Sequence, residues 1–185
     1  FQTLARRNIQ TLARYSFNRI VTCDPHSFHV LKNEYGAFGG DYQVQHHSTY
    51  MAELIQNGSV RLGQHKGTSV TYHDPCYLGR ANGEYEAPRM LLEKLDAELV
   101  EMKRCKTNGL CCGAGGAQMF KEPEKGKKDI NVERTEEALS KEPKIIATGC
   151  PFCNTMMTDG VKHFNKNTEV EVKDIVELLA EAEDL

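Results

Sequence analysis

"KIIATGCPFCNTMMTDGV", residues 144–161, joins an apolar run to a proline that stands between two cysteines. The run KIIATG predicts a strand, because it is short and rich in β-branched residues. Pro151 favours the first turn of a helix. The stretch therefore predicts a strand that leads directly into a helix, with Cys150 and Cys153 at the junction.

"RIVTCDPHSFHVL", residues 19–31, repeats this pattern 126 positions earlier in the chain. At this offset Pro25 coincides with Pro151, whereas Asp24 and Ser27 take the places of the two cysteines. Helical segments precede and follow both motifs. The order of elements is thus the same in both parts of the chain, which predicts a duplicated unit with pseudo-symmetry.

Strand-like and helix-like patterns alternate along the whole chain. We expect strands within residues 19–23, 42–47, 69–74, 98–102, 144–149 and 169–172. We expect further helices at residues 2–14, 48–57, 87–95, 129–141 and 174–182. Ser48 is expected to be the N-cap of the second of these helices. This alternation predicts an α/β fold of two repeats, with mainly parallel sheets and flanking helices.

The glycine-punctuated loop GQHKG, residues 63–67, indicates a boundary near residue 66. We therefore divide the chain into residues 1–66, the later part of a first repeat, and residues 67–185, a complete second repeat. The first repeat is truncated at its N-terminus, and the chain opens without Met in a helical pattern. We expect the chain to be a piece of a longer polypeptide.

The composition narrows the class of protein. The chain has 185 residues, seven cysteines and a formal net charge of −3. This charge gives no electrostatic reason to expect nucleic acid as a partner. No apolar run approaches the roughly 18 residues that a membrane span requires. Clustered cysteines without a signal-peptide pattern indicate a reducing compartment, where thiols serve metal or redox chemistry.

Five of the cysteines fall into three short motifs. Cys76 follows the predicted strand SVTYHD, Cys111 and Cys112 stand in LCCGAGG, and Cys150 and Cys153 form CPFC. Thirty-four residues separate the first motif from the second, and thirty-seven separate the second from the third. Because the carboxyl ends of parallel strands meet at one edge of a sheet, we expect all five to converge.

The surroundings of these cysteines suit metal binding. A helix that begins at Pro151 offers free N–H groups and a positive dipole, which favour thiolate. Gly113, Gly115 and Gly116 let the backbone approach an inorganic cofactor and donate N–H groups to sulfur. Zinc or an ordinary iron–sulfur cubane takes four ligands, so five thiols favour a larger or open iron–sulfur assembly. A zinc-binding assembly module and a dithiol/disulfide oxidoreductase using CPFC remain alternatives.

The pattern C…CCG…CPFC resembles the CCG-type cysteine-rich domain found in the B-type component of heterodisulfide reductase and in its D-type relatives. The strings that carry the resemblance span residues 72–179, namely YHDPCYLGR, EAPR, LCCGAGGAQM, NVERTEEAL, CPFCNTMMTDGV and VKDIVELL. They are similar to those of bacterial heterodisulfide-reductase-like iron–sulfur oxidoreductases that accompany electron-transfer flavoproteins and acyl-CoA dehydrogenases.

The resemblance implies an oxidoreductase that transfers electrons through a noncubane [4Fe-4S] cluster. By position, its ligands would be the five cysteines of the second repeat: Cys76, Cys111, Cys112, Cys150 and Cys153. The implied partners are a ferredoxin-like iron–sulfur domain, an electron-transfer flavoprotein and a membrane cytochrome b-like segment. The implied location is the cytoplasm, or the cytoplasmic face of a membrane reached through other parts of the protein.

The first repeat departs from the family pattern. Asp24 and Ser27 stand where the family often has a cysteine pair, and Cys23 lies one position too early to replace it. Asp24 before Pro25 is a favourable helix cap. Two interpretations remain open: DPHSF only caps a helix, or Asp24 or His26 touches the edge of a metal site.

Polar residues near the motifs also have two interpretations. His73 and Asp74 either line the cluster and move protons or make ordinary hydrogen bonds at the strand end. Arg89 either balances cluster charge or lies on the surface. Cys105, in a charged loop outside the motifs, is expected to be a free surface thiol.

Two adjacent histidines end a predicted strand of the first repeat. The strand is YQVQHH, and the 126-residue offset makes Val172 and Lys173 the counterparts of His46 and His47. Two interpretations remain open: these histidines only end the strand, or they take part in a site at the cleft between the repeats.

Overall fold

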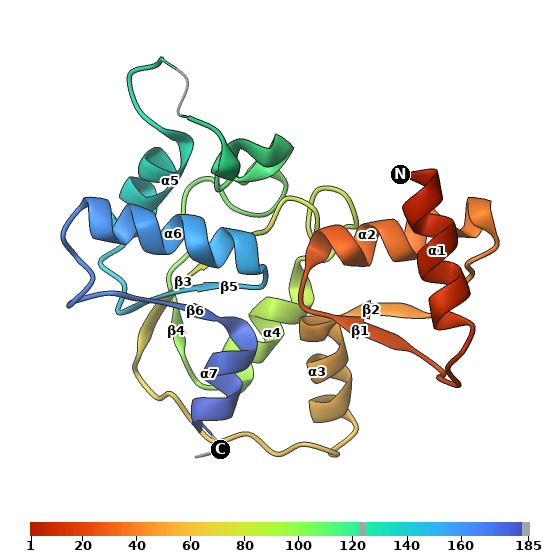
Figure 1. Cartoon of the computed structure of the whole chain (residues 1–185). Helices are drawn as coiled ribbons and strands as arrows, with labels where there is room; N and C mark the ends of the chain where they lie inside the picture. Colours follow the sequence, from red (N-terminus) through yellow and green to blue (C-terminus); the bar gives the residue numbers. More distant parts are fainter. Residues whose placement is uncertain (123–124, 183–185) are drawn as a thin grey trace.

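The structure is a computed structural model that describes residues 1–122 and 125–182. Within these ranges the chain forms two parallel sheets with helices packed on them (Figure 1). The helices are α1 (Gln2–Leu12), α2 (Pro25–Asn33), α3 (His47–Gln56), α4 (Glu86–Lys94), α5 (Ile130–Leu139), α6 (Pro151–His163) and α7 (Ile175–Ala182). The strands are β1 (Ile20–Thr22), β2 (Val44–His46), β3 (Ser69–His73), β4 (Glu98–Leu99), β5 (Ile145–Thr148) and β6 (Glu171–Asp174).

The larger sheet confirms the predicted α/β class. Its strand order is β4-β3-β5-β6, and every neighbouring pair is parallel. Helices α5 and α6 lie on one face, while α4 and α7 lie on the other (Figure 1). Such a three-layer arrangement buries both faces of the central strands, which explains why β5 reads as a short apolar run.

The apolar core explains how these layers hold together. On one face Ile146 packs with Met157 and Val161 of α6. On the other face the buried side chains are Ala52, Val70, Tyr72, Leu91, Leu92, Leu95, Ile145, Ala147, Ile175, Leu178 and Leu179. Burial of a large apolar side chain contributes roughly 1.5–3 kcal/mol before the entropy of ordering is subtracted. The sheet therefore has a core of its own, independent of any group bound at its edge.

The smaller sheet pairs β1 with β2 in parallel. Helix α2 connects them and begins at Pro25, where the Asp24 carboxylate accepts hydrogen bonds from the backbone N–H groups of His26 (3.0 Å) and Ser27 (3.1 Å). The predicted cap is therefore present. Helix α2 begins here for two local reasons. The ring of Pro25 fixes φ at the first helical residue, and Asp24 before it caps the helix.

The two repeats have the same order of elements, but their register differs from the expected one. Ile20 pairs with Val44, 24 positions later, whereas Ile146 pairs with Val172, 26 positions later. The offset between the repeats therefore grows by two residues after the first strand. The counterpart of His46 is therefore Asp174 rather than Val172. His46 pairs with the last residue of β1, and Asp174 pairs with the last residue of β5.

The start of α3 also differs from the prediction. The N-cap is His46, and the Nδ1 atom of its ring accepts a hydrogen bond from the backbone N–H of Ser48 at 3.4 Å. The Ser48 hydroxyl lies 2.7 Å from the same nitrogen. Because the serine side chain is buried against the histidine ring, it cannot serve as the cap that its residue type predicted.

The two repeats share a core across the predicted boundary at residue 66. Ala52 of α3, in the first repeat, packs in the same apolar cluster as Leu91 of α4 and Leu178 of α7. The division into residues 1–66 and 67–185 remains a prediction about the repeats. In the structure, the last helix of the first unit contributes to the core of the second.

Candidate metal centre

Three loops at the carboxyl edge of the larger sheet carry the five cysteines. Strand β3 ends at His73, shortly before Cys76, and β5 ends at Thr148, shortly before Cys150. The loop that follows β4 supplies the adjacent pair Cys111 and Cys112. Parallel strands place these loops side by side, as the spacing of the motifs predicted.

The structure brings all five sulfur atoms into one continuous chain. Cys153 Sγ lies 3.4 Å from Cys112 Sγ. The side chains of Cys112 and Cys76 lie close enough to Cys111 to shift its pKa, and that of Cys153 lies close enough to Cys150 to do the same. All seven cysteines, which lie within the described residues, are free thiols. The convergence of the five is therefore a feature of the fold, whereas their role as metal ligands remains a prediction.

The contacts between the sulfur atoms shift their pKa values in opposite directions. Hydrogen bonds from Cys112 and Cys76 hold the pKa of Cys111 far below its usual value. A hydrogen bond from Cys153 lowers the pKa of Cys150 to about 6. The pKa values of the other three cysteines are raised, since losing a proton would place a second negative charge beside a thiolate. These three are Cys76, Cys112 and Cys153.

Backbone groups stabilise the two sulfur atoms with lowered pKa. The N–H of Gly113 donates to Cys111 Sγ at 3.3 Å. Gly113 has φ +92°, and a Cβ there would approach Ile130 Cβ at 3.2 Å, so this loop conformation favours glycine. Cys150 is the N-cap of α6, and Pro151 occupies the first turn. The positive end of α6 therefore faces the Cys150 sulfur.

The donor set fits a polynuclear iron–sulfur group. Thiolates are soft ligands that suit iron–sulfur clusters and zinc. The fifth thiol exceeds what one tetrahedral zinc ion takes. Cys112, Cys150 and Cys153 are buried, while Cys76 and Cys111 are partly exposed. The arrangement would shield a bound group on one side and leave it open to solvent on the other.

His26 of the first repeat reaches this cluster. The His26 Nδ1 atom lies 3.0 Å from the Asp24 carboxylate, and one ligand atom each from Asp24, His26 and Cys150 lie within 4.8 Å of one another. The ring packs on Tyr77, with centroids 4.3 Å apart. Hydrogen bonds to Asp24 and then to Cys150 raise the pKa of His26 to about 9. Asp24 is thus a helix cap and also positions a histidine at the edge of the thiol cluster.

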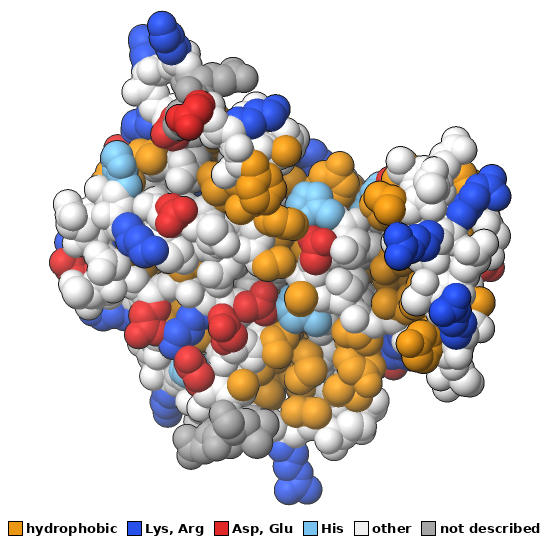
Figure 2. Space-filling view, in the orientation of Figure 1, with side chains coloured by type: hydrophobic (Ala, Val, Ile, Leu, Met, Phe, Trp, Pro, Cys, Tyr) orange, Lys and Arg blue, Asp and Glu red, His pale blue; other side chains and the backbone are white. Residues whose placement is uncertain are grey.

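The two helices that begin at equivalent positions face each other at this point. The N-terminal end of α2 lies opposite that of α6 in Figure 1. In the space-filling view, apolar, histidine and acidic side chains meet near the middle of the visible face, where these helix ends approach (Figure 2). The cysteine cluster therefore lies at the junction of the two repeats.

His73 and Asp74 occupy the end of β3 and have different partners. His73 Nδ1 accepts a hydrogen bond from Arg134 Nε at 2.9 Å, and burial lowers the pKa of His73 to about 3. Asp74 forms a two-pronged ion pair with Arg89 at 2.8 and 2.9 Å and accepts the backbone N–H of Lys106 at 2.7 Å. Arg89 is therefore buried rather than on the surface, and its ion pairs with Asp74 and Glu101 hold the loop that leads to Cys111.

Arg134 is a residue of this site that no local signal in the sequence reveals. It lies in the helix-forming string NVERTEEAL, which reads as an ordinary amphipathic helix. Its side chain is fully buried and bridges His73 to the backbone carbonyl of Arg104. These partners lie 61 and 30 positions away in the sequence, so only the tertiary fold reveals the contact.

His46 and His47 brace the turn before Cys150 rather than entering the sulfur chain. His46 Nε2 lies 3.0 Å from the carbonyl oxygen of Gly149, and His47 Nε2 lies 2.7 Å from the Asp174 carboxylate. A Cβ at position 149 would approach the His46 ring at 3.2 Å. Both histidines therefore lie at the junction between the repeats, and His46 contacts the backbone next to a candidate ligand.

The remaining cysteines lie outside the chain of five sulfur atoms. Cys23 is exposed. Cys105 is half-buried rather than fully on the surface, and burial raises its pKa. The loop around Cys105 folds back onto Asp74 through the neighbouring Lys106, which explains the partial burial.

Comparison with known proteins defines the class. Residues 70–158 match the family described as "CCG: Cysteine-rich domain". This match includes all five cysteines of the cluster. Residues 70–158 therefore form a CCG cysteine-rich domain, which confirms the resemblance inferred from the motifs.

Three relatives show which proteins the chain is similar to. The chain is 45% identical over 183 residues to the probable iron–sulfur-binding oxidoreductase FadF of Bacillus subtilis, covering 98% of this chain and 26% of the relative. It is 39% identical over 188 residues to EtfAB:quinone oxidoreductase of Syntrophomonas wolfei, covering 98% and 26%. It is 32% identical over 187 residues to the D chain of dihydromethanophenazine:CoB–CoM heterodisulfide reductase of Methanosarcina barkeri, covering 97% and 44%.

The chain spans between about a quarter and less than half of the length of these relatives. Their similarity therefore concerns one part of larger proteins. In the described part of this chain, no helix is long and apolar enough to cross a membrane.

Proposed function

We propose that this chain binds an iron–sulfur cluster and passes electrons as part of an oxidoreductase. The observation that carries the proposal is the continuous contact of five thiols from three loops, with Cys112 and Cys153 sulfur atoms 3.4 Å apart. The names of the relatives support it, since they include an iron–sulfur-binding oxidoreductase, a quinone oxidoreductase and a component of heterodisulfide reductase.

We propose further that the cluster is a noncubane [4Fe-4S] group held by Cys76, Cys111, Cys112, Cys150 and Cys153. An ordinary cubane uses four thiolates, so it would leave one of these five without a metal. Cys111 and Cys112 are adjacent in the sequence, so both sulfur atoms lie in the same loop. This favours a group in which one thiolate is shared by, or bridges, two metal ions. When bound, such a group supplies one-electron oxidation and reduction.

The protein's own groups prepare this site. Two sulfur atoms already have lowered pKa values, which reduces the number of protons that binding must displace. The N–H of Gly113 and the N-terminus of α6 offset the negative charge that thiolates bring. The partly exposed Cys76 and Cys111 form the open side, through which electrons would enter or leave.

The intact site lies in the second repeat alone. Asp24 and Ser27 replace the cysteines of the first repeat, so we propose one cluster rather than two within these residues. A single site suits electron relay or one-site reduction. The partners we propose are redox proteins or domains: a ferredoxin-like iron–sulfur domain, an electron-transfer flavoprotein or a membrane cytochrome b-like segment. We propose the cytoplasm, or the cytoplasmic face of a membrane, as the location.

Iron and acid-labile sulfide analysis of anaerobically prepared protein tests the proposal. Cys153→Ser should lose most of the bound iron and sulfide, because it removes a thiolate from the middle of the sulfur chain. Cys105→Ser is the matched control, since Cys105 is a free thiol outside that chain. The control should keep the iron content of the parent.

The same measurements distinguish the alternatives. One zinc ion per chain without labile sulfide would instead support a structural zinc module. Absence of both metals, together with reversible oxidation of Cys150 and Cys153 to a disulfide, would support dithiol chemistry. Equal iron loss in both serine variants would contradict the ligand assignment.

A further inference from the structure

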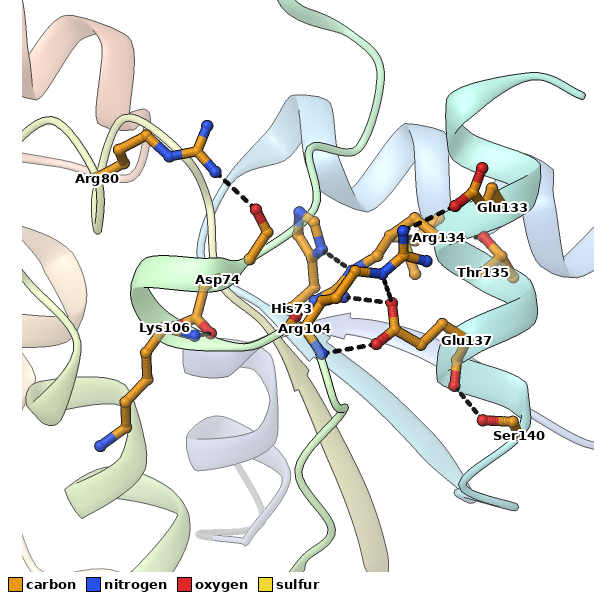
Figure 3. Close-up of polar contacts among 12 residues, drawn as sticks. His73, Asp74, Arg80, Arg104, Lys106, Glu133, Arg134, Thr135, Glu137 and Ser140 are labelled. Atoms are coloured by element: carbon orange, nitrogen blue, oxygen red, sulfur yellow. Dashed lines mark hydrogen bonds and ion pairs between the residues drawn. The ribbon is translucent and has the colours of Figure 1, made fainter.

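A buried arginine–histidine pair lies behind the thiol cluster. Arg134 and His73 are both 0% exposed. Arg134 Nε donates to His73 Nδ1 at 2.9 Å, and its Nη1 donates to the carbonyl oxygen of Arg104 at 2.7 Å (Figure 3). The arginine is thus held at two points, and it presents a fixed donor to the histidine.

This contact determines which ring nitrogen carries the proton. An arginine side chain has only donors and stays protonated in proteins, so His73 Nδ1 must accept. The proton of the neutral ring then sits on Nε2. Figure 3 shows Nε2 on the side of the ring that points away from Arg134.

The Nε2–H group lacks a protein partner but has sulfur nearby. Among the described residues, His73 Nε2 is buried without a hydrogen-bond partner. One ring nitrogen of His73 and the sulfur atoms of Cys112 and Cys153 lie within 4.8 Å of one another. Nδ1 is already occupied by Arg134, so Nε2 is the nitrogen available to these sulfur atoms. Buried N–H groups without a partner are rare in folded proteins and call for an explanation.

We propose that His73 donates its Nε2–H hydrogen bond to the Cys112–Cys153 sulfur pair when the iron–sulfur cluster is bound, and that Arg134 is the positioning residue that fixes this tautomer. The inference rests on the proposed function, because the bond gains its acceptor when these thiols become thiolates. It gives the cluster a donor that none of the cysteine motifs supplies.

The expected consequence is a higher reduction potential of the cluster. Hydrogen bonds to the ligating sulfur atoms stabilise the more negative, reduced state. The ionic groups around Arg134 largely compensate one another, since Arg134 and Arg104 face Glu137 and Glu133. The effect therefore comes mainly from the N–H dipole of His73, and removal of that N–H should favour the oxidised state.

The test begins with the parent protein. Iron and labile sulfide analysis first establishes that a cluster is bound, so failure of the proposed function is recognised separately. Electron–nuclear double resonance of ¹⁵N-histidine-labelled protein in H₂O and D₂O should then show a weakly coupled histidine nitrogen and an exchangeable proton. Both signals should remain in His26→Phe, which removes the histidine ring that lies near Cys150. Absence of both signals would overturn the proposal. A strong nitrogen coupling would also overturn it, because it would mean that His73 binds iron directly.

Redox titration of variants tests the effect on potential. In His73→Phe, the ratio of reduced to oxidised cluster at a fixed potential should fall about tenfold, which equals 59 mV for a one-electron couple. His73→Gln restores an N–H donor and should recover part of this loss. Arg134→Gln should lower the ratio, because the ring is free to place its proton on either nitrogen.

Arg104→Gln is the matched control. It changes a neighbouring arginine side chain but leaves the backbone carbonyl that holds Arg134. Its potential should differ from that of the parent much less than the potentials of His73→Phe and Arg134→Gln do, because the N–H of His73 stays in place. Unchanged potentials in His73→Phe and Arg134→Gln, or equal shifts in all variants including Arg104→Gln, would overturn the assignment. The double-resonance measurement on the parent remains decisive if a variant fails to bind the cluster.

Discussion

Replacement of Asp24 by alanine should destabilise the apoprotein by about 1.5 kcal/mol. The carboxylate accepts two backbone N–H groups, at 3.0 and 3.1 Å, and loss of an N-cap costs about 1 kcal/mol. Its contact with His26 adds about 0.5 kcal/mol, a small value because both side chains are partly exposed, at 22% and 35%. For a chain of 185 residues this corresponds to a fall in Tm of roughly 3–6 °C.

Two further variants separate the parts of this effect in thermal and urea unfolding followed by circular dichroism. Asp24→Asn keeps a side-chain cap and should lose only about 0.5 kcal/mol, since asparagine is an equally good N-cap. Asp129→Ala is the control, because Asp129 is the N-cap of α5 without a side-chain hydrogen bond. The reasoning is refuted if asparagine costs as much as alanine at position 24, or if Asp129→Ala costs as much as Asp24→Ala.

Two other outcomes can be measured on the apoprotein. Burial lowers the pKa of His46 from 6.5 to about 4, so between these pH values the unfolded chain binds a proton that the folded chain does not. The free energy of unfolding should therefore fall by roughly 3 kcal/mol as the pH falls through this window, and urea titration of His46→Gln should show a shallower dependence. In hydrogen exchange, loss of the cluster should reduce the protection of residues 108–118. The protection of β5 should stay, because that strand keeps its apolar packing on both faces. If β5 exchanged as fast as the loop, the cluster would be what organises the fold.

Most of the fold follows from local patterns in the sequence. Short apolar runs, a proline after each of two strands and the internal repeat predicted the parallel α/β arrangement. The register of the first repeat did not follow, because the offset of 126 residues holds at Pro25 and Pro151 but changes by two at β6. An insertion inside a loop leaves no mark in the strands on either side, so only their pairing reveals it.

The candidate site, like the fold, could be predicted from the sequence only in part. The convergence of the five cysteines could be predicted, because each motif follows a strand and parallel strands end at the same edge. The contact of His26 with the site was only one of two interpretations that the sequence left open, and the contact of Arg134 with His73 could not be predicted. Both cross large distances in sequence and depend on how helices pack, and neither residue type is unusual in a helix.

The absence of a side chain at position 149 ties the two repeats together. The His46 ring from the first repeat fills the space that a Cβ of residue 149 would need. A larger residue at position 149 would therefore press on the rings of His46 and Tyr72, and these side chains would have to shift to make room for it. The repeat that has Asp24 and Ser27 instead of cysteines thus supplies a side chain that packs on the backbone next to Cys150, so a change in one repeat is felt in the other.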